Sequence, residues 1–144
     1  LLMRKGGERN LPILAEAALS ARRSQRQLVR QIVDSGAFVH KGAGIYLGVL
    51  EQKVDGELLP ALLPEASVIV IAFPIVRPDG KKVWGVKTRT SRRFPLGASL
   101  LTAGLPGWGG RWNAGSTIRK GGTEDLDGFI GVLVPWMRGE LLSS

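Results

Sequence analysis

The sequence predicts a single α/β domain, because segments of strand character and segments of helical periodicity alternate along its 144 residues. The strongest strand signal is an apolar run at 67–76, which a short turn joins to an alternating run at 81–90. The strongest helical signal is the spacing of apolar residues over 11–35. A hydrophobic content of 44% over this length is sufficient for one globular core.

Residues 11–35 are expected to form the first helix. Apolar side chains recur there at near-helical spacing, with Asn10 as a candidate N-cap and Gly36 as a candidate C-cap. Arginines crowd the second half of this helix, and the simplest interpretation is that they form its solvated face (Arg22, Arg23, Arg26 and Arg30). Of all the predicted elements, only this helix is expected to be separable from the rest.

Two shorter elements and a β-hairpin follow. Residues 44–50 have strand character, and 57–66 predict a short helix that prolines interrupt. In the hairpin, 77–80 fit a type I turn, with proline in the second position and glycine in the fourth. The first arm, 67–76, is apolar on both faces, which is typical of a strand inside a sheet. Pro74 cannot donate to a β-ladder, so it is expected to mark a bulge or the end of that strand.

The second arm of the hairpin separates apolar side chains from cationic ones by strand alternation. One side carries Trp84, Val86 and Thr88, and the other carries Val83, Gly85, Lys87 and Arg89. Two interpretations are open. The second side is either a cationic platform that continues into Arg92 and Arg93, or the ordinary polar face of a half-buried strand.

The last third of the chain predicts two helices around a glycine-rich stretch. Residues 96–105 are expected to form a short helix, 118–122 a turn, and 124–138 a helix that Thr123 caps. An Asp-x-Asp pair at 125–127 could hold a divalent cation, but it opens the predicted helix. Helix capping and favourable interaction with the helix dipole explain the pair more simply, so we expect no metal site there.

The composition excludes several kinds of chemistry. The chain has no cysteine, which excludes disulfides, zinc ribbons and thiolate nucleophiles. Its single histidine, His40, excludes metal sites that need two imidazoles, and a lone histidine is more often structural than catalytic. Lys and Arg number 20 against 12 Asp and Glu, for a net charge of +8. This excess favours polyanions such as nucleic acid or nucleotides, and a basic but inert surface is the alternative.

The sequence predicts no contact with a membrane. The longest uncharged apolar stretch, 68–76, is too short to span a bilayer, and the pattern of a signal peptide is not found. We therefore expect a cytoplasmic protein. The first residue is leucine rather than methionine, which suggests a fragment or a processed piece of a longer protein.

The stretch GWGGRWNAGST at 107–117 is the main candidate for ligand binding. A P-loop needs lysine where Ser116 stands, and the Rossmann glycine pattern is also broken. What remains is a loop whose glycines let backbone N–H groups approach an anion, with Arg111 as a bidentate phosphate ligand. Neutral donors and stacking rings would come from Asn113, Ser116, Thr117, Trp108 and Trp112. A surface loop whose tryptophans cover the core is the other open interpretation.

Three pieces of the sequence, in this order, resemble a known family. They are the hairpin arm ending in VWGVKTRT at 83–90, a short helix, and GGRWNAGS at 109–116. They resemble the DHHA1 domain, the C-terminal substrate-binding domain of DHH-family phosphoesterases. That family includes RecJ-type single-strand exonucleases, nano-RNases and related hydrolases of oligonucleotides or cyclic dinucleotides. The resemblance covers residues 40–140 of this chain.

Two motifs carry the resemblance. The family's hairpin ends in a Ser-x-Arg-Ser-like segment, to which Lys87-Thr88-Arg89-Thr90 is similar. The family's signature loop reads G-G-H-x-x-A-A-G, and residues 109–116 align with it position by position. Arg111 stands where the family usually has histidine. Arginine keeps a phosphate contact but removes the imidazole, which indicates a divergent branch.

The resemblance implies a mixed β-sheet flanked by helices at 37–144, preceded by a connector helix at 1–36. It also implies that the chain binds the phosphodiester of a nucleotide or of a short single-stranded nucleic acid. Hydrolysis would belong to a DHH catalytic domain, in cis or in trans, that holds manganese or magnesium ions. This chain itself would then carry no catalytic residue, metal or cofactor. The implied phosphate-binding residues are Lys87, Arg89, Thr90, Gly109, Gly110, Arg111, Asn113, Ala114, Gly115 and Ser116.

Two other functions compete with this one. A protein-interaction or dimerisation module would use the tryptophans and the apolar last helix, with a homodimer as one outcome and the basic surface incidental. A self-sufficient, metal-free phosphatase is the least favoured, because no general base or nucleophile pair stands out in the sequence.

Overall fold

The computed structural model describes residues 2–90, 108–111, 114–118 and 121–143, with side chains from Ile13 onward except that of Arg111. The elements are α1 (Leu2–Asp34), β1 (Phe38–His40), β2 (Ile45–Val49), η1 (Gly56–Leu58), α2 (Leu59–Leu62), β3 (Val68–Val76), β4 (Lys82–Thr90), β5 (Gly109–Arg111), β6 (Ala114–Ser116) and α4 (Leu126–Ser143). The helix expected at 96–105 lies outside the described residues. Among the described helices, none combines the length and apolar character that crossing a membrane requires.

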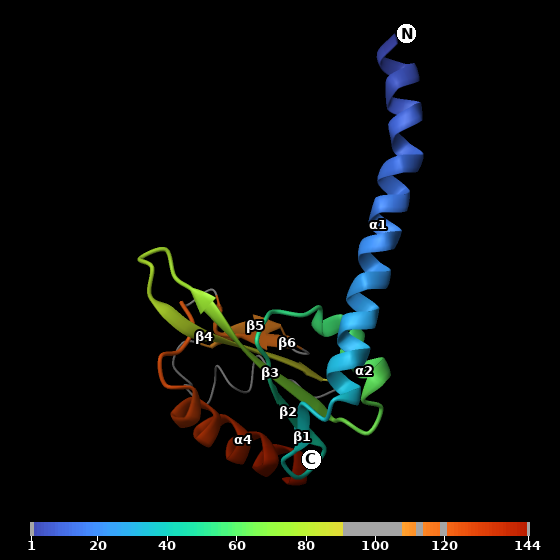
Figure 1. Ribbon diagram of the computed structural model, residues 1–144. Helices are drawn as coiled ribbons and strands as arrows, with labels where there is room; N and C mark the ends of the chain where they lie inside the picture. Colours follow the sequence, from blue (N-terminus) through green and yellow to red (C-terminus); the bar gives the residue numbers. More distant parts are fainter. Residues whose placement is uncertain (1, 91–107, 112–113, 119–120, 144) are drawn as a thin grey trace.

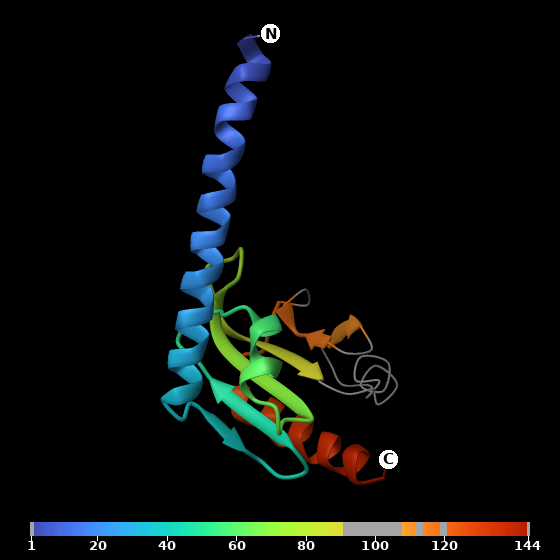
Figure 2. The same cartoon turned by 90° about the vertical axis from the view of Figure 1, so that its right-hand side faces the viewer.

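A six-stranded mixed sheet forms the centre of the fold. Its strand order is β1-β2-β3-β4-β6-β5, with β2 and β3 parallel and every other neighbouring pair antiparallel. The parallel pair needs a crossover connection, and that connection carries η1 and α2. Helix α4 packs on one face of the sheet, while α2 and the end of α1 pack on the other (Figures 1 and 2). This architecture confirms the predicted α/β class with a mixed sheet flanked by helices.

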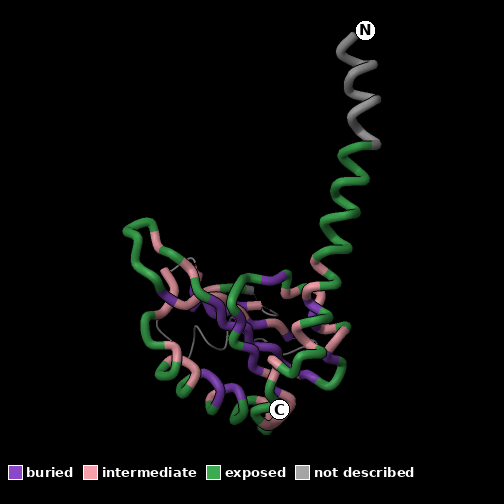
Figure 3. Tube along the Cα trace, in the orientation of Figure 1, coloured by how far each residue is buried: buried purple, intermediate pink, exposed green. Residues whose placement is uncertain are grey.

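Helix α1 projects from the body of the protein (Figure 1). It begins at Leu2, earlier than the expected residue 11, and it ends as predicted before Gly36. Gly36 has a φ of 79°, and its amide donates to the Val33 carbonyl at 3.2 Å. Every side chain over 13–24 is exposed, whereas Val29 is fully buried, so only the last turns pack on the sheet (Figure 3). The four arginines of its second half are exposed, which confirms the predicted solvated face.

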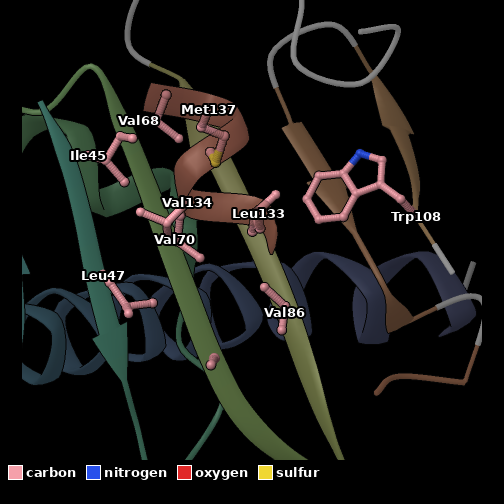
Figure 4. Close-up of a cluster of buried hydrophobic side chains, with 10 residues drawn as sticks. Ile45, Leu47, Val68, Val70, Val86, Trp108, Leu133, Val134 and Met137 are labelled. Atoms are coloured by element: carbon pink, nitrogen blue, oxygen red, sulfur yellow. The ribbon is translucent and has the colours of Figure 1, made fainter. Parts of the chain in front are cut away.

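Strand β3 is buried on both faces over 68–73, as predicted for a strand inside a sheet. The cluster under α4 contains Ile45, Leu47, Val68, Val70, Ala72, Val86, Trp108, Leu133, Val134 and Met137 (Figure 4). The cluster on the opposite face, which we call the α1–α2 cluster, contains Val29, Leu50, Val54, Leu59, Leu63, Ala66, Ile69, Ile71 and Phe73. Alternate β3 residues therefore supply both cores.

Pro74 does not mark a bulge or a strand end, because β3 continues through it in unbroken register with β4. Its partner Trp84 exchanges backbone hydrogen bonds with Thr123, on the side of β4 away from β3. Pro74 and Trp84 are therefore a non-hydrogen-bonded pair, and the Pro74 nitrogen points toward the β2 side. The last residue of β2, Val49, pairs with Ala72, so no ladder donor is required at Pro74.

The predicted turns are present, but the cap of the last helix is different. In the hairpin turn, the Gly80 amide donates to the Arg77 carbonyl at 2.8 Å. Helix α4 is capped by Asp125, whose carboxylate accepts from the Gly128 amide at 3.0 Å. The predicted cap, Thr123, instead forms the β-bridge with Trp84, which fixes its backbone to the sheet. The carboxylate of Asp125 thus has a structural role at the start of α4.

Candidate anion-binding site

The end of β4 presents two cations on one face of the sheet. Lys87 and Arg89 are both partly exposed on the face of the α1–α2 cluster, whereas Thr88 is buried on the α4 side. The predicted alternation of this strand is therefore confirmed. Thr90, which was also expected to bind phosphate, follows the parity of Thr88 and is 9% exposed. The fold does not bring Thr90 to the face that carries the two cations.

The glycine-rich stretch forms two strands, not the expected loop. β6 adds to the free edge of β4, and β5 adds to β6, both antiparallel. Two rows of residues in register cross these three strands: Arg89–Ala114–Arg111 and Lys87–Ser116–Gly109. The prediction of a loop was wrong because pairing with β4 orders a backbone that its glycines alone disfavour. Asn113 lies outside the described residues, as do Arg92 and Arg93.

The glycines of this hairpin have different roles. A Cβ at Gly110, whose φ is 151°, would overlap the Ala114 carbonyl oxygen, and a Cβ at Gly115 would overlap the indole of Trp108. Both glycines are therefore required by packing. At Gly109 no described atom lies within 4 Å of the Cβ position. Of the three glycines, Gly109 alone leaves room for a ligand to approach the sheet. Gly109 lies in register with Ser116 and Lys87.

Trp108 is a core residue. It is 2% exposed, and its ring stacks on Phe129 with the centroids 6.2 Å apart. It therefore cannot stack on a nucleic-acid base, which was one of the two roles that the sequence left open for it. Trp112, the other candidate for stacking, lies outside the described residues. The indole Nε1 of Trp108 has no hydrogen-bond partner among the described residues. For this tryptophan the second interpretation, covering the core, is the correct one.

A third cation, Lys53, lies beside Lys87. Burial lowers the pKa of Lys87, and the charge of Lys53, a contact with its side chain and the charge of Arg89 lower it further. Asp55 acts in the opposite direction. Lys53 was missed in the sequence because it belongs to neither motif. Its position follows from the path of the connection between β2 and β3, which is a long-range property of the fold.

Arg89 makes an ion pair with Glu57 of η1. The distance from Nη2 of Arg89 to Oε1 of Glu57 is 3.3 Å, and the two side chains are 33% and 69% exposed. The stem of Arg89 lies against Gly56, where an added Cβ would be 3.8 Å from its Cγ. Among the described residues, the ion pair engages one of the five guanidinium N–H donors with one carboxylate oxygen.

The remaining polar candidates have modest roles. The Ser116 hydroxyl oxygen accepts from the Ile118 amide at 3.0 Å, which leaves its own O–H available as a donor. His40 is exposed, accepts from the Gly44 amide at 3.1 Å and stacks on Tyr46, so its contacts are structural. Within the described ranges, no three His, Cys, Asp or Glu side chains are grouped to hold a metal ion.

Comparisons with known proteins show a shared fold. No family model and no curated protein matches this chain. Among solved structures, a pGpG-specific phosphodiesterase, PggH from Vibrio cholerae, is similar, with a TM-score of 0.55 and 13% sequence identity. The similarity covers 84% of this chain and 40% of that one, so this chain spans less than half the length of the phosphodiesterase. The α/β fold is therefore one that a nucleotide-processing enzyme also contains.

Proposed function

We propose that this chain binds the phosphate groups of a nucleotide or a short single strand, as a DHHA1-type substrate-binding domain of a DHH-family phosphoesterase. The observation that carries the proposal is the gathering of Lys87, Arg89 and Lys53 on one face of the sheet, in register with Arg111. Hydrolysis would take place in a separate DHH domain with manganese or magnesium, in cis or in trans.

The similarity to PggH supports this proposal. The name of that enzyme describes it as a phosphodiesterase specific for pGpG, a dinucleotide with phosphate groups. A domain with the same fold and a cationic sheet face has the chemistry needed to hold such a ligand. The net charge of +8 also favours association with polyanions.

Each residue of the site would have a distinct role. The guanidinium of Arg89 would make charge-assisted hydrogen bonds to phosphate oxygens, and Lys87 would supply a second positive charge. The open backbone at Gly109 would let the ligand approach the sheet, and the Ser116 hydroxyl would donate to it. Arg111 would act as a further clamp at the end of the Arg89 row, with Asn113 two positions further along the sequence.

Binding of short single strands tests the proposal. We expect Arg89→Ala and Lys87→Ala each to weaken binding of a fluorescent oligonucleotide at low salt by roughly tenfold or more, since a hydrogen bond to a charged group contributes about 1.5–3 kcal/mol. Fluorescence anisotropy measures the affinity. Lys82→Ala is the matched control, because Lys82 is exposed at the start of the same strand.

Two results would contradict the proposal. If neither oligonucleotide nor mononucleotide binds at low salt, the polyanion function fails. If Arg89→Ala and Lys87→Ala bind as well as Lys82→Ala, binding occurs elsewhere on the basic surface. Chelation by EDTA should not change the affinity, because lysine and arginine contact phosphate without a metal.

A protein-interaction module is the second candidate function. The exposed apolar residues of helix α1 support it better than the tryptophans do. Trp84, Trp108 and Trp136 pack against the core under α4. By contrast, Ile13 and Leu14 are 65% and 63% exposed on the projecting helix. Sedimentation at several protein concentrations measures the oligomeric state and separates the two functions. A stable dimer whose association does not change when nucleotides are added would favour the interaction module.

A further inference from the structure

The segment between β2 and α2, residues 50–58, lies on the sheet beside the candidate site, and we call it the crossover segment. Its start is fixed where the Leu50 amide donates to the Ala72 carbonyl at 2.7 Å. Its middle is fixed by Val54, which is buried in the α1–α2 cluster. Gly56 then lies against Ile71 and the stem of Arg89. The segment is therefore part of the packed structure rather than a free loop.

The crossover segment carries both a cation, Lys53, and carboxylates near the end of β4. Lys53 adds a cation next to Lys87 and so extends the cationic face of β4. Like charges at this proximity repel each other, and an anion bound between them would relieve that repulsion. Burial is the main cause of the lowered pKa of Lys87, and the charges of Lys53 and Arg89 lower it further. Asp55 partly offsets this repulsion, and its carboxylate accepts from the Glu57 amide at 3.1 Å.

Glu57 is the carboxylate that meets the guanidinium of the site. It offers one oxygen to one nitrogen of Arg89, at 3.3 Å, and its side chain is 69% exposed. An exposed ion pair of this kind contributes little to stability. A phosphate group is a stronger partner for arginine, because it can accept two parallel hydrogen bonds. Glu57 can therefore be displaced by a phosphate at low cost.

We propose that Glu57 is an internal competitor for the phosphate at Arg89, and that Lys53 is a third cation of the same site. The ligand class is a phosphate monoester or diester of a nucleotide. In the free protein the carboxylate occupies Arg89, and the arriving phosphate displaces it and is held by Lys53, Lys87 and Arg89. This inference rests on the proposed function and adds the two residues of the crossover segment that set its affinity.

Two isosteric substitutions test the inference in the full chain, with pGpG as the probe in calorimetric titrations at low salt. Glu57→Gln removes the competing charge, and we expect about three- to tenfold tighter binding. Lys53→Met removes the ammonium and keeps the stem, and we expect about three- to tenfold weaker binding. Glu51→Gln and Lys82→Met change the same charges at exposed positions, and we expect effects within about twofold. Circular dichroism verifies the fold of each variant.

The direction of the Glu57→Gln effect is decisive. If Glu57 serves to orient Arg89, the substitution will weaken binding, and the inference is overturned. It is also overturned if Lys53→Met behaves like Lys82→Met while Arg89→Ala still weakens binding by roughly tenfold or more. In that case the proposed function is retained without the further inference. If neither wild type nor Glu57→Gln binds pGpG or any short oligonucleotide, both proposals fail. Binding by Glu57→Gln where wild type shows none supports both.

Discussion

Residues of one type have different roles in the glycine-rich hairpin, and only the three-dimensional contacts separate them. Gly115 is where the indole of Trp108 lies against the sheet, and Gly110 allows the close approach of β5 to β6. Gly109 has open space on its Cβ side. In the sequence all three belonged to one ligand-binding motif. The structure gives two of them packing roles, and no described atom lies close to the Cβ position of the third.

Substitution of Gly115 tests this assignment. We expect Gly115→Ala to lower the free energy of unfolding by about 1–3 kcal/mol, because the added methyl group would overlap the buried Trp108 ring. Urea denaturation, monitored by tryptophan fluorescence, measures the change. Gly131→Ala in α4 is the control: its Cβ meets open space, so a neutral or stabilising effect of up to about 1 kcal/mol is expected. Equal stability of Gly115→Ala and wild type would disprove the packing role.

Lys87 makes the stability of the folded chain depend on pH. Its pKa is lowered in the folded chain, mainly by burial, from an ordinary value of 10.5. Between the lowered pKa and 10.5 the unfolded chain binds more protons, so this group makes stability rise with pH. The gain is complete above the ordinary pKa and is lost as pH falls through the lowered one. At neutral pH the charged Lys87 therefore opposes folding.

Removing that charge should stabilise the protein when no anion is bound. We expect Lys87→Met to raise Tm at pH 7 relative to Lys82→Met, and the difference to shrink as pH approaches 10.5. Thermal unfolding at several pH values measures it. A lower Tm for Lys87→Met at pH 7 would mean that the ammonium is stabilised by its surroundings, contrary to this account.

At the scale of elements, the sequence predicted structures formed by neighbouring residues, but not those that depend on contacts between distant segments. The hairpin of β3 and β4 was found because its turn and its alternation lie within one short segment. The crossover segment was not recognised beside the candidate site, because the contact of Glu57 with Arg89 joins residues 32 positions apart in the sequence. For the same reason the strands of the glycine-rich stretch were taken for a loop, since only the edge of β4 orders them.

The two halves of α1 should contribute very differently to stability. Val29 is fully buried against the sheet, whereas Leu19 is 51% exposed on the projecting part. We expect Val29→Ala to cost about 1–3 kcal/mol of unfolding free energy through lost burial. Leu19→Ala should change it by no more than about 0.5 kcal/mol. Chemical denaturation of the two variants checks this, and equal effects would show that α1 packs otherwise.

At the scale of the whole molecule, the two faces of the sheet are used differently. On one face α4 covers a core that reaches from β2 to Trp108 next to β5. On the other face α1 and α2 cover side chains of β1, β2 and β3. Lys87 and Arg89 lie one strand further along that face. The candidate site thus lies on the face of the sheet that α1 and α2 cover, next to the edge of the α1–α2 cluster.

The position of Pro74 has a consequence for self-association. Beyond Ala72 the strand β3 has no β2 partner, and the exposed Val76 ends this stretch. An unpaired strand edge with apolar side chains is a template on which a second chain can add by backbone pairing. Proline at position 74 removes the donor that such pairing would need, and its ring obstructs an approaching strand. We therefore expect Pro74 to disfavour the addition of a second chain to this part of β3.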